Sequence, residues 1–382
     1  SLRALIQRVL TTLYRIWARM TPEDIYLSTQ TALAELALSG CTTASDHLYL
    51  FPNGSKLDDE IEGAATTGMR LHSSRGSMSL GQSQGGLPPD SVVDDEESIL
   101  KDSERLIQRY HDPSHGSKLQ IVLAPCSPFS VTSQLMRDSA VMARKYHVHL
   151  HTHLAETEDE DDFCLEKFGK KPVAYMQSVD WIGDDVWFAH SVWVDDAEIN
   201  LYAQHGCGVA HCPSSNMRLA SGIAPAMNML SRGVKLGLGV DGSASNDSSH
   251  MLAEVRQAML LARLNSGIKG ASRSAPDAPP LMTARQALSI ATRGGASVLG
   301  RNDIGSLEAG KCADFFAINL NKLDYTGALD DPVAAVVFCA PVKADWTVVG
   351  GNVIVREGQF TKFDIQAHVR KHNAAARRLI QI

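Results

Sequence analysis

The stretch His147-Val-His-Leu-His-Thr-His153 decides the fold of this chain of 382 residues. We interpret it as a strand, because a helical pattern over Thr132–Lys145 precedes it and the helical patterns Asp159–Lys167 and Pro172–Val179 follow it. The strand also ends in polar side chains, which continue to Glu156. It is therefore one unit of an alternating strand and helix pattern, with chemistry at its carboxyl end.

The same alternation extends in both directions along the chain. Further strands are predicted at Cys41–Asp46, Gly68–His72, Leu119–Ala124, Val186–His190, Gly208–His211 and Lys235–Val240. Further helices are predicted at Leu10–Leu38, Asp94–Tyr110, Asp195–His205 and Ala224–Arg232. Such alternation indicates a parallel sheet with covered faces. Seven units are visible, one short of a closed (β/α)8 barrel. A doubly wound sheet is the rival, but it explains less well why polar residues gather at so many strand ends.

The C-terminal third changes character after two more helices, Met251–Leu264 and Thr283–Leu299. Residues 313–362 are rich in strand-forming residues, and Gly350-Gly351-Asn352 lies between two β-branched runs, which is a hairpin signal. We therefore predict an α/β fold with a TIM-like barrel over residues 10–310, part of a small β-sandwich over 311–362 and a C-terminal surface helix over 363–382. The loop from Ser79 to Asp94, rich in Gly, Ser and Pro, is expected to border the pocket.

Composition excludes several classes of partner. The formal net charge of −7 argues against nucleic acid, because phosphate binding needs concentrated Lys and Arg. No stretch approaches the roughly 18 uninterrupted apolar residues of a transmembrane helix, so we expect no membrane partner. The seven cysteines form no Cys-x-x-Cys pair, as is typical of free thiols in a reducing compartment. With no signal-peptide pattern either, we expect a cytoplasmic protein.

Three polar residues end three of the predicted buried strands, in the order His153, His190 and Asp241. His153 is followed by Glu156, and an imidazole with a nearby carboxylate suits a zinc ligand beside a proton shuttle. Taken singly, each has an ordinary explanation: a surface histidine before an acidic helix start, a satisfied core histidine, or a helix-capping aspartate. Together, burying them unpaired would cost several kcal/mol each, roughly, which a divalent cation would offset.

These residues belong to longer motifs. They are His153-x-x-Glu156, His190, Ala210-His-Cys-Pro-Ser-Ser-Asn216, Gly239-Val-Asp-Gly-Ser-Ala-Ser-Asn246, Ala291-Thr-Arg-Gly-Gly-Ala296 and Ile304-Gly-Ser-Leu-Glu-Ala-Gly-Lys-Cys-Ala-Asp314. In this order they resemble the amidohydrolase superfamily, and within it the purine and triazine deaminase branch. The resemblance is greatest to 8-oxoguanine deaminases, on Arg75-Gly-Ser-Met-Ser-Leu-Gly81, Ala124-Pro-Cys-Ser-Pro-Phe129 and Asn216-Met-Arg-Leu-Ala-Ser-Gly222.

The resemblance implies a zinc-dependent aminohydrolase that acts on cyclic amidines and holds one divalent ion, with iron as the alternative metal. His153 and Asp241 would be metal ligands, together with two histidines of a first His-x-His strand. Glu156 would move protons to the substrate, Asp241 would take the proton of water, and His190 would hydrogen-bond the reacting oxygen. The implied reaction is 8-oxoguanine to urate and ammonia. Guanine deamination and the amino- or chlorohydrolysis of an s-triazine are the alternatives, and we expect a small purine-like substrate and a homo-oligomer.

One departure from the family pattern concerns the start of the chain, since no His-x-His strand precedes Leu10. We expect that the chain is a truncated fragment or has lost a segment. A metal-free barrel scaffold is the alternative outside the enzymes. Arg75 follows a strand-like run and would bind a ring carbonyl of the substrate, although an exposed loop arginine is an equal alternative. His47 and His72 also follow strands, and the sequence assigns neither a role.

Overall fold

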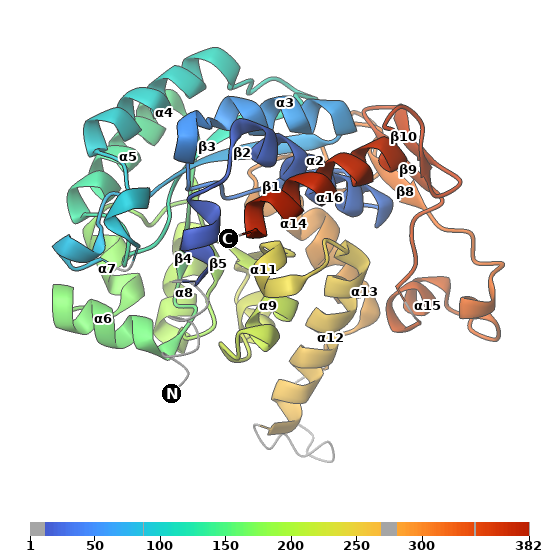
Figure 1. Cartoon of the computed structure of the whole chain (residues 1–382). Coiled ribbons are helices and arrows are strands. Elements are labelled where there is room, and N and C mark those ends of the chain that lie inside the picture. Colours follow the sequence, from blue (N-terminus) through green and yellow to red (C-terminus); the bar gives the residue numbers. More distant parts are fainter. Residues whose placement is uncertain (1–11, 87, 269–280, 340, 382) are drawn as a thin grey trace.

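The computed structural model describes residues 12–86, 88–268, 281–339 and 341–381, and these form two sheets with surrounding helices (Figure 1). The larger sheet contains β1 (Thr43–Ser45), β2 (Arg70–Ser77), β3 (Leu119–Pro125), β4 (His149–Leu154), β5 (Val186–His190), β6 (Gly208–His211) and β7 (Lys235–Leu238). The smaller sheet contains β8 (Phe315–Ala317), β9 (Trp346–Val349), β10 (Asn352–Arg356) and β11 (Gln359–Phe360).

All neighbours in the larger sheet are parallel, and their spatial order follows the sequence from β1 to β7. Sequential order in one direction is the arrangement of a barrel, whereas a doubly wound sheet reverses its strand order at a switch point. The seven strands curl into a half-barrel of which β1 and β7 are the edges, with helices on the outside (Figure 1). The predicted barrel-type α/β fold is confirmed.

Helices connect the strands of the half-barrel and continue beyond it. They are α2 (Pro22–Leu38), α3 (Leu57–Thr67), α4 (Glu96–Tyr110), α5 (Ser133–Tyr146), α6 (Glu158–Phe168), α7 (Pro172–Ser178), α8 (Asp196–His205), α9 (Pro213–Arg218), α10 (Ala226–Ser231), α11 (Ser243–Asn246), α12 (Met251–Ile268), α13 (Ala284–Ser289), α14 (Gly295–Val298), α15 (Pro332–Phe338) and α16 (Ile365–Ile380). A π-helical turn, Ile290–Gly294, links α13 to α14. Residues 12–17 are also helical, whereas the predicted helix start at Leu10 lies outside the described residues.

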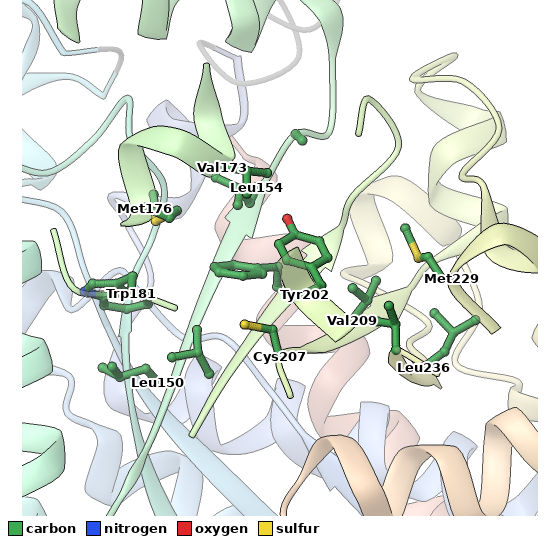
Figure 2. Packing of buried hydrophobic residues seen from close by; sticks show 14 of the residues in the cluster. Leu150, Leu154, Val173, Met176, Trp181, Tyr202, Cys207, Val209, Met229 and Leu236 are labelled. Atoms are coloured by element: carbon green, nitrogen blue, oxygen red, sulfur yellow. The ribbon is translucent and has the colours of Figure 1, made fainter. Parts of the chain in front are cut away.

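The main hydrophobic core lies between the strands and the outer helices (Figure 2). Leu150 and Leu154 of β4 contribute to it, together with Tyr202 of α8 and the fully buried Trp181. The indole Nε1 of Trp181 donates to the carbonyl oxygen of Met136, 2.7 Å away. Successive side chains of a strand alternate between its faces, so the odd-numbered histidines of β4 face the interior of the half-barrel.

The smaller sheet is antiparallel in the order β11-β10-β9-β8 and joins the barrel through buried polar contacts. Asp314, just before β8, forms an ion pair with Arg70 of β2, with Nε and Oδ2 2.6 Å apart. Thr347 of β9 donates to the carbonyl oxygen of Ala37 at 2.7 Å. Helix α16 packs against α2 through His368, which is buried although most of the helix is exposed.

Among the described residues, no helix combines the length and apolar character needed to cross a lipid bilayer.

Candidate active site

The carboxyl ends of β4, β5 and β7 bring together the four residues that the sequence singled out. One ligand atom each from His153, His190 and Asp241 lies within 4.8 Å of the other two. The Nε2 atom of His190 is 3.8 Å from Oε2 of Glu156 and 4.0 Å from Oδ2 of Asp241. Two imidazoles and two carboxylates therefore converge on one point, as expected for strand ends that meet at the same edge of a parallel sheet.

The backbone departs from regular strand geometry at or close to the residues that carry these side chains. The φ angle is 50° at Ala155, 72° at His190, 44° at Ser191 and 60° at Asp241, all in the left-handed region. In β5, Val186 and Phe188 lie in the outer hydrophobic core, and regular alternation would direct His190 the same way. The left-handed backbone instead allows His190 to line the interior cavity. Such conformations cost about 1–3 kcal/mol each and cluster at functional sites.

Hydrogen bonds made by the Nδ1 atoms fix the orientation of both imidazole rings. The Nδ1 atom of His153 donates to the carbonyl oxygen of Cys126 at 2.8 Å, and Nδ1 of His190 donates to Oδ1 of Asn216 at 2.9 Å. A carbonyl oxygen only accepts, so the proton of neutral His153 resides on Nδ1 and its Nε2 lone pair is available. An outer hydrogen bond of this kind is what orients a metal-binding histidine.

The carboxylate of Asp241 is also held in place. Its Oδ2 accepts hydrogen bonds from Ser215 Oγ at 2.5 Å and Ser245 Oγ at 2.9 Å, and its Oδ1 accepts from the backbone N–H of Gly242 at 2.7 Å. Burial acts to raise the pKa of Asp241, but His190, His153 and the Ser215 hydrogen bond outweigh it and lower the pKa. The side chain is therefore an oriented anion at neutral pH.

The two histidines respond in opposite ways to this environment. Burial lowers the pKa of His153, and the neighbouring His190 lowers it further, so His153 is neutral. Burial also acts to lower the pKa of His190, but the carboxylates of Glu156 and Asp241 reverse the effect and raise it. His153 thus presents a lone pair, whereas His190 is suited to donate a hydrogen bond.

Glu156 lies on the turn between β4 and α6, with its side chain 24% exposed. Its Oε1 is 3.4 Å from Ser221 Oγ, and its backbone N–H donates to Oε2 of Glu160 at 3.2 Å. Glu160 is buried in the first turn of α6, and burial raises its pKa to about 8. A protonated Glu160 therefore supports the backbone of the turn while Glu156 remains open to the cavity.

A cavity of about 1160 Å³ includes all four residues and extends along the edge strands β1 and β7. It also reveals residues to which the sequence gave no role. His47 and Tyr49, on the segment after β1, line it beside His151 of β4 and Trp187 of β5. Burial and the neighbouring histidine rings lower the pKa of His47 and bring that of His151 to about 3, so both are neutral. The position of His47 after a strand was the only sequence signal for it.

The structure does not bring Arg75 to this cavity. Its guanidinium lies on the outer face of β2, where Nε donates to Oδ2 of Asp102 in α4 at 2.9 Å and the group stacks over the ring of Phe51 at 4.2 Å. Only 5% of Arg75 is exposed, and the cavity lining does not include it. The expectation that Arg75 binds substrate failed because the sequence does not reveal which face of the strand its side chain occupies.

The donor set at the strand ends fits a divalent metal. A neutral imidazole with a free Nε2 and an ionised carboxylate are preferred zinc ligands. A second group of possible ligand atoms is formed by His115, Asp303 and Cys312. There, however, Arg301 binds the Asp303 carboxylate through two hydrogen bonds of 2.7 Å. Of the two groups found among the described residues, the first alone combines open ligand atoms with a cavity.

A half-barrel whose strand ends present histidines and carboxylates to a cavity is the architecture of metal-dependent hydrolases. The amidohydrolase family model matches residues 3–354. The chain belongs to the amidohydrolase family.

Relatives agree with this assignment in sequence and in structure. The chain is 50% identical to an 8-oxoguanine deaminase from Pseudomonas aeruginosa, over 97% of this chain and 80% of the relative. It is 37% identical to a hydroxydechloroatrazine ethylaminohydrolase from a Pseudomonas species, over 96% and 75% of the two chains. Among solved structures, an atrazine chlorohydrolase from Arthrobacter aurescens in complex with zinc superimposes with a TM-score of 0.88 at 31% identity, over 98% and 81% of the two chains.

Proposed function

We propose that this amidohydrolase is a zinc-dependent deaminase that hydrolyses 8-oxoguanine to urate and ammonia. The observation that carries the proposal is the convergence of His153, Glu156, His190 and Asp241 in one cavity. The 50% identity to an 8-oxoguanine deaminase supports the choice of substrate.

His153 and Asp241 would hold the metal ion, since one offers an oriented lone pair and the other an oriented anion. Zinc, when bound, supplies a Lewis acid that activates water near neutral pH. Side chains of the protein would carry out the proton transfers of amidine hydrolysis and would hydrogen-bond the reacting oxygen.

Hydrolysis adds water to the ring carbon that bears the exocyclic amine and then breaks the bond from that carbon to the amine nitrogen. Asp241 accepts a proton from the attacking water and passes it on to Glu156, which delivers it to the adjacent ring nitrogen. When the ring carbon becomes a carbonyl, the proton that remains on the oxygen passes through Glu156 to the departing amine. His190, whose pKa is raised by the carboxylates of Glu156 and Asp241, would donate a hydrogen bond through Nε2 to the oxygen that joins the ring carbon. Ammonia leaves, and the ring carbon becomes a carbonyl.

A second candidate is the hydrolysis of an amine or chloride substituent on an s-triazine, and the structural likeness to the atrazine chlorohydrolase favours it. Both reactions need the same proton shuttle, so kinetics must separate them. We expect the highest kcat/KM with 8-oxoguanine in a panel that includes guanine and hydroxyatrazine. An absence of 8-oxoguanine turnover would refute the first proposal.

The metal requirement separates an enzyme from a metal-free scaffold. We expect about one zinc per chain by metal analysis after reconstitution, and loss of activity on chelation. Substoichiometric zinc together with a folded protein would favour the scaffold.

We also infer a homo-oligomer in a reducing compartment such as the cytoplasm. The seven free cysteines agree with the compartment. Leu260, Leu264 and Ile268, exposed on one face of α12, agree with self-association. Light scattering after size-exclusion chromatography would give the oligomeric state.

A further inference from the structure

Serines from two short helices hold the Asp241 carboxylate. Ser215 belongs to α9 and Ser245 to α11, and the hydroxyl groups of both donate to Oδ2 of Asp241, at 2.5 and 2.9 Å. These helices contain only six and four residues. Isolated helices shorter than roughly 12–15 residues are marginal in water, so neither helix is stable on its own. Contacts outside the two helices must therefore fix the positions of both serines.

Glu254, in the first turn of α12, makes one such contact to each helix. Its Oε2 accepts a hydrogen bond from the backbone N–H of Ser214 in α9 at 3.1 Å, and its Oε1 accepts one from Nδ2 of Asn246 in α11 at 3.0 Å. Each donor residue is the direct chain neighbour of a serine that binds Asp241. Helix α9 packs against both α11 and α12 (Figure 1). One carboxylate thus joins the two segments that carry these serines.

Glu254 is buried away from the cavity. It is 1% exposed and the cavity lining does not include it, so it does not act by touching a substrate there. Burial raises the pKa of Glu254, and the hydrogen bonds from Ser214 and Asn246 oppose that rise. If only packing mattered, an apolar side chain of similar volume would suit this position better than a carboxyl group among neutral donors. The two hydrogen bonds are therefore what the carboxyl group contributes.

The segment that contains α11 needs such an anchor because its backbone is strained at both ends. The φ angle is 60° at Asp241 and 63° at Asp247, which flank the helix. Left-handed conformations of residues other than glycine are unfavourable and persist only where surrounding contacts enforce them. The hydrogen bond from Asn246 to Glu254 is a contact of this kind, made close to the end of the segment.

We propose that Glu254 is a positioning residue that fixes the Asp241 carboxylate by holding α9 and α11 in place. The inference rests on the proposed function, in which Asp241 is a zinc ligand, and adds to it a residue that touches neither the ion nor the substrate. Groups that orient a metal ligand typically contribute about 10–100-fold to metal affinity. Because Glu254 does not bind Asp241 itself, its effect must pass through the two serines.

Two substitutions remove the contacts of Glu254 in steps. Glutamine has a single acceptor oxygen, so one of the two N–H groups loses its partner in Glu254→Gln, whereas both lose it in Glu254→Leu. We expect the Kd for zinc, measured by chelator competition, to rise about tenfold in Glu254→Gln and further in Glu254→Leu. Glu35→Gln is the matched control, because Glu35 also accepts a backbone N–H, that of Ser249 at 3.1 Å, but is exposed on α2. Its Kd should stay within about twofold of wild type.

A double-mutant cycle separates positioning from a general loosening of the fold. In a Ser215→Ala/Ser245→Ala background, Asp241 has already lost both hydroxyl groups, so Glu254→Gln should raise the Kd for zinc by at most about threefold. A full tenfold increase in that background would show that the effect does not pass through the serines and would overturn the proposal. A wild-type Kd in Glu254→Gln would overturn it as well.

The outcome for Glu254 is distinguishable from that for the proposed function. If the protein bound zinc but turned over no oxopurine, the proposed substrate would be wrong, and the comparison of zinc Kd values would still decide the role of Glu254. If wild type bound no zinc, the proposed function would fail. Crystal structures of wild type and Glu254→Gln would then provide the test: Asp241 should lose its hydrogen bond to at least one serine, and an unchanged carboxylate would refute the role of Glu254.

Discussion

In the described structure, neither a backbone N–H nor an ion pair with Lys or Arg immobilises the Glu156 carboxylate, and this distinguishes it from the other carboxylate of the site. A proton shuttle must move between two acceptors, so this freedom suits its proposed role. Asp241, in contrast, is held by three hydrogen bonds and suits a fixed position.

Glu156→Gln should lower kcat by about 10²–10⁴-fold, the usual contribution of general acid–base catalysis. The amide preserves shape but cannot carry the proton, so zinc content and melting temperature should stay at wild-type values. Steady-state kinetics and metal analysis check this. Glu158→Gln, at an exposed position two residues away, is the control and should retain full activity. Wild-type turnover by Glu156→Gln would exclude the shuttle.

Glu160→Gln should stabilise the protein increasingly as the pH rises. Glu160 has a pKa of about 8 in the folded chain, whereas an exposed glutamate ionises near ~4.3. Between these values the unfolded chain loses a proton that the folded chain keeps, so the free energy of unfolding falls with rising pH. Glutamine does not ionise, so the free energy of unfolding of the variant should exceed that of wild type by about 1–3 kcal/mol at pH 8. Melting curves of both proteins at pH 5 and 8 test it; a difference that does not grow with pH would contradict the assignment.

Strand order alone was enough to predict which side chains would lie close together. His153, Glu156, His190 and Asp241 were expected to meet because the carboxyl ends of parallel strands share one edge of the sheet, and their ligand atoms do converge. His47 lies in the cavity lining and is hydrogen-bonded to Ala124, 77 positions away in the chain, which no local pattern encodes. Arg75 was misplaced for a related reason, since its partners Asp102 and Phe51 come from other elements.

At the scale of elements, a series of hydrogen bonds joins α16 to α2, and each bond in it has a defined donor and acceptor. Nδ1 of His368 donates to Oε1 of Gln30 at 3.1 Å, so its Nε2 accepts from Thr31 Oγ1 at 2.7 Å. Thr31 in turn accepts from Nδ1 of His372. Because Nε2 of His368 accepts a hydrogen bond in this series, His368 must be neutral for the series to form.

Acid should therefore loosen this contact. Burial, then His372 and Lys371, lower the pKa of His368, and burial lowers that of His372 despite the opposing Asp24. Because the unfolded chain takes up protons first, stability is present above pH ~6.5 and is lost as the pH falls below it. Urea denaturation between pH 5 and 8 should show this slope. It should flatten when both histidines are replaced by glutamine, and an unchanged slope would rule out the pair as its source.

Several elements follow directly from the sequence, and others do not. Strand β5 has the predicted bounds. Helix α15 was not predicted, because it is a short apolar helix of seven residues within a region of strand-forming residues. The π-helical turn Ile290–Gly294 interrupts what local pattern presents as one helix; Gly294 lies there against the Leu236 carbonyl, where a Cβ would not fit.

At the scale of the whole molecule, one buried ion pair joins the two sheets. Arg70 and Asp314 have side chains only 2% and 3% exposed, and Asp314 also accepts a hydrogen bond from the backbone of Gly350 at 2.6 Å. The curled sheet, a small sheet after it and a C-terminal helix were each predicted from sequence, but the packing of that helix against α2 was not. The residues that connect them were not, because contacts between distant segments leave no periodic signal.

Asp314→Asn should destabilise the protein by about 3–5 kcal/mol, since it leaves the Arg70 guanidinium buried without a counter-charge. Asp331→Asn is the matched control, because its ion pair with Arg285 is largely exposed and should contribute less than about 1 kcal/mol. Chemical denaturation of both variants gives the comparison. Equal effects would mean that burial does not govern the strength of these pairs.

The left-handed residues at the strand ends have a consequence for protein design. Transferring the four reactive side chains onto the regular strands of an idealised barrel would direct the imidazole corresponding to His190 toward the helices instead of the cavity. A working graft would have to copy the backbone at Ala155, His190, Ser191 and Asp241 together with the side chains. β-Branched replacements at these four positions would resist the required torsion angles, so directed-evolution libraries built on this scaffold should omit them.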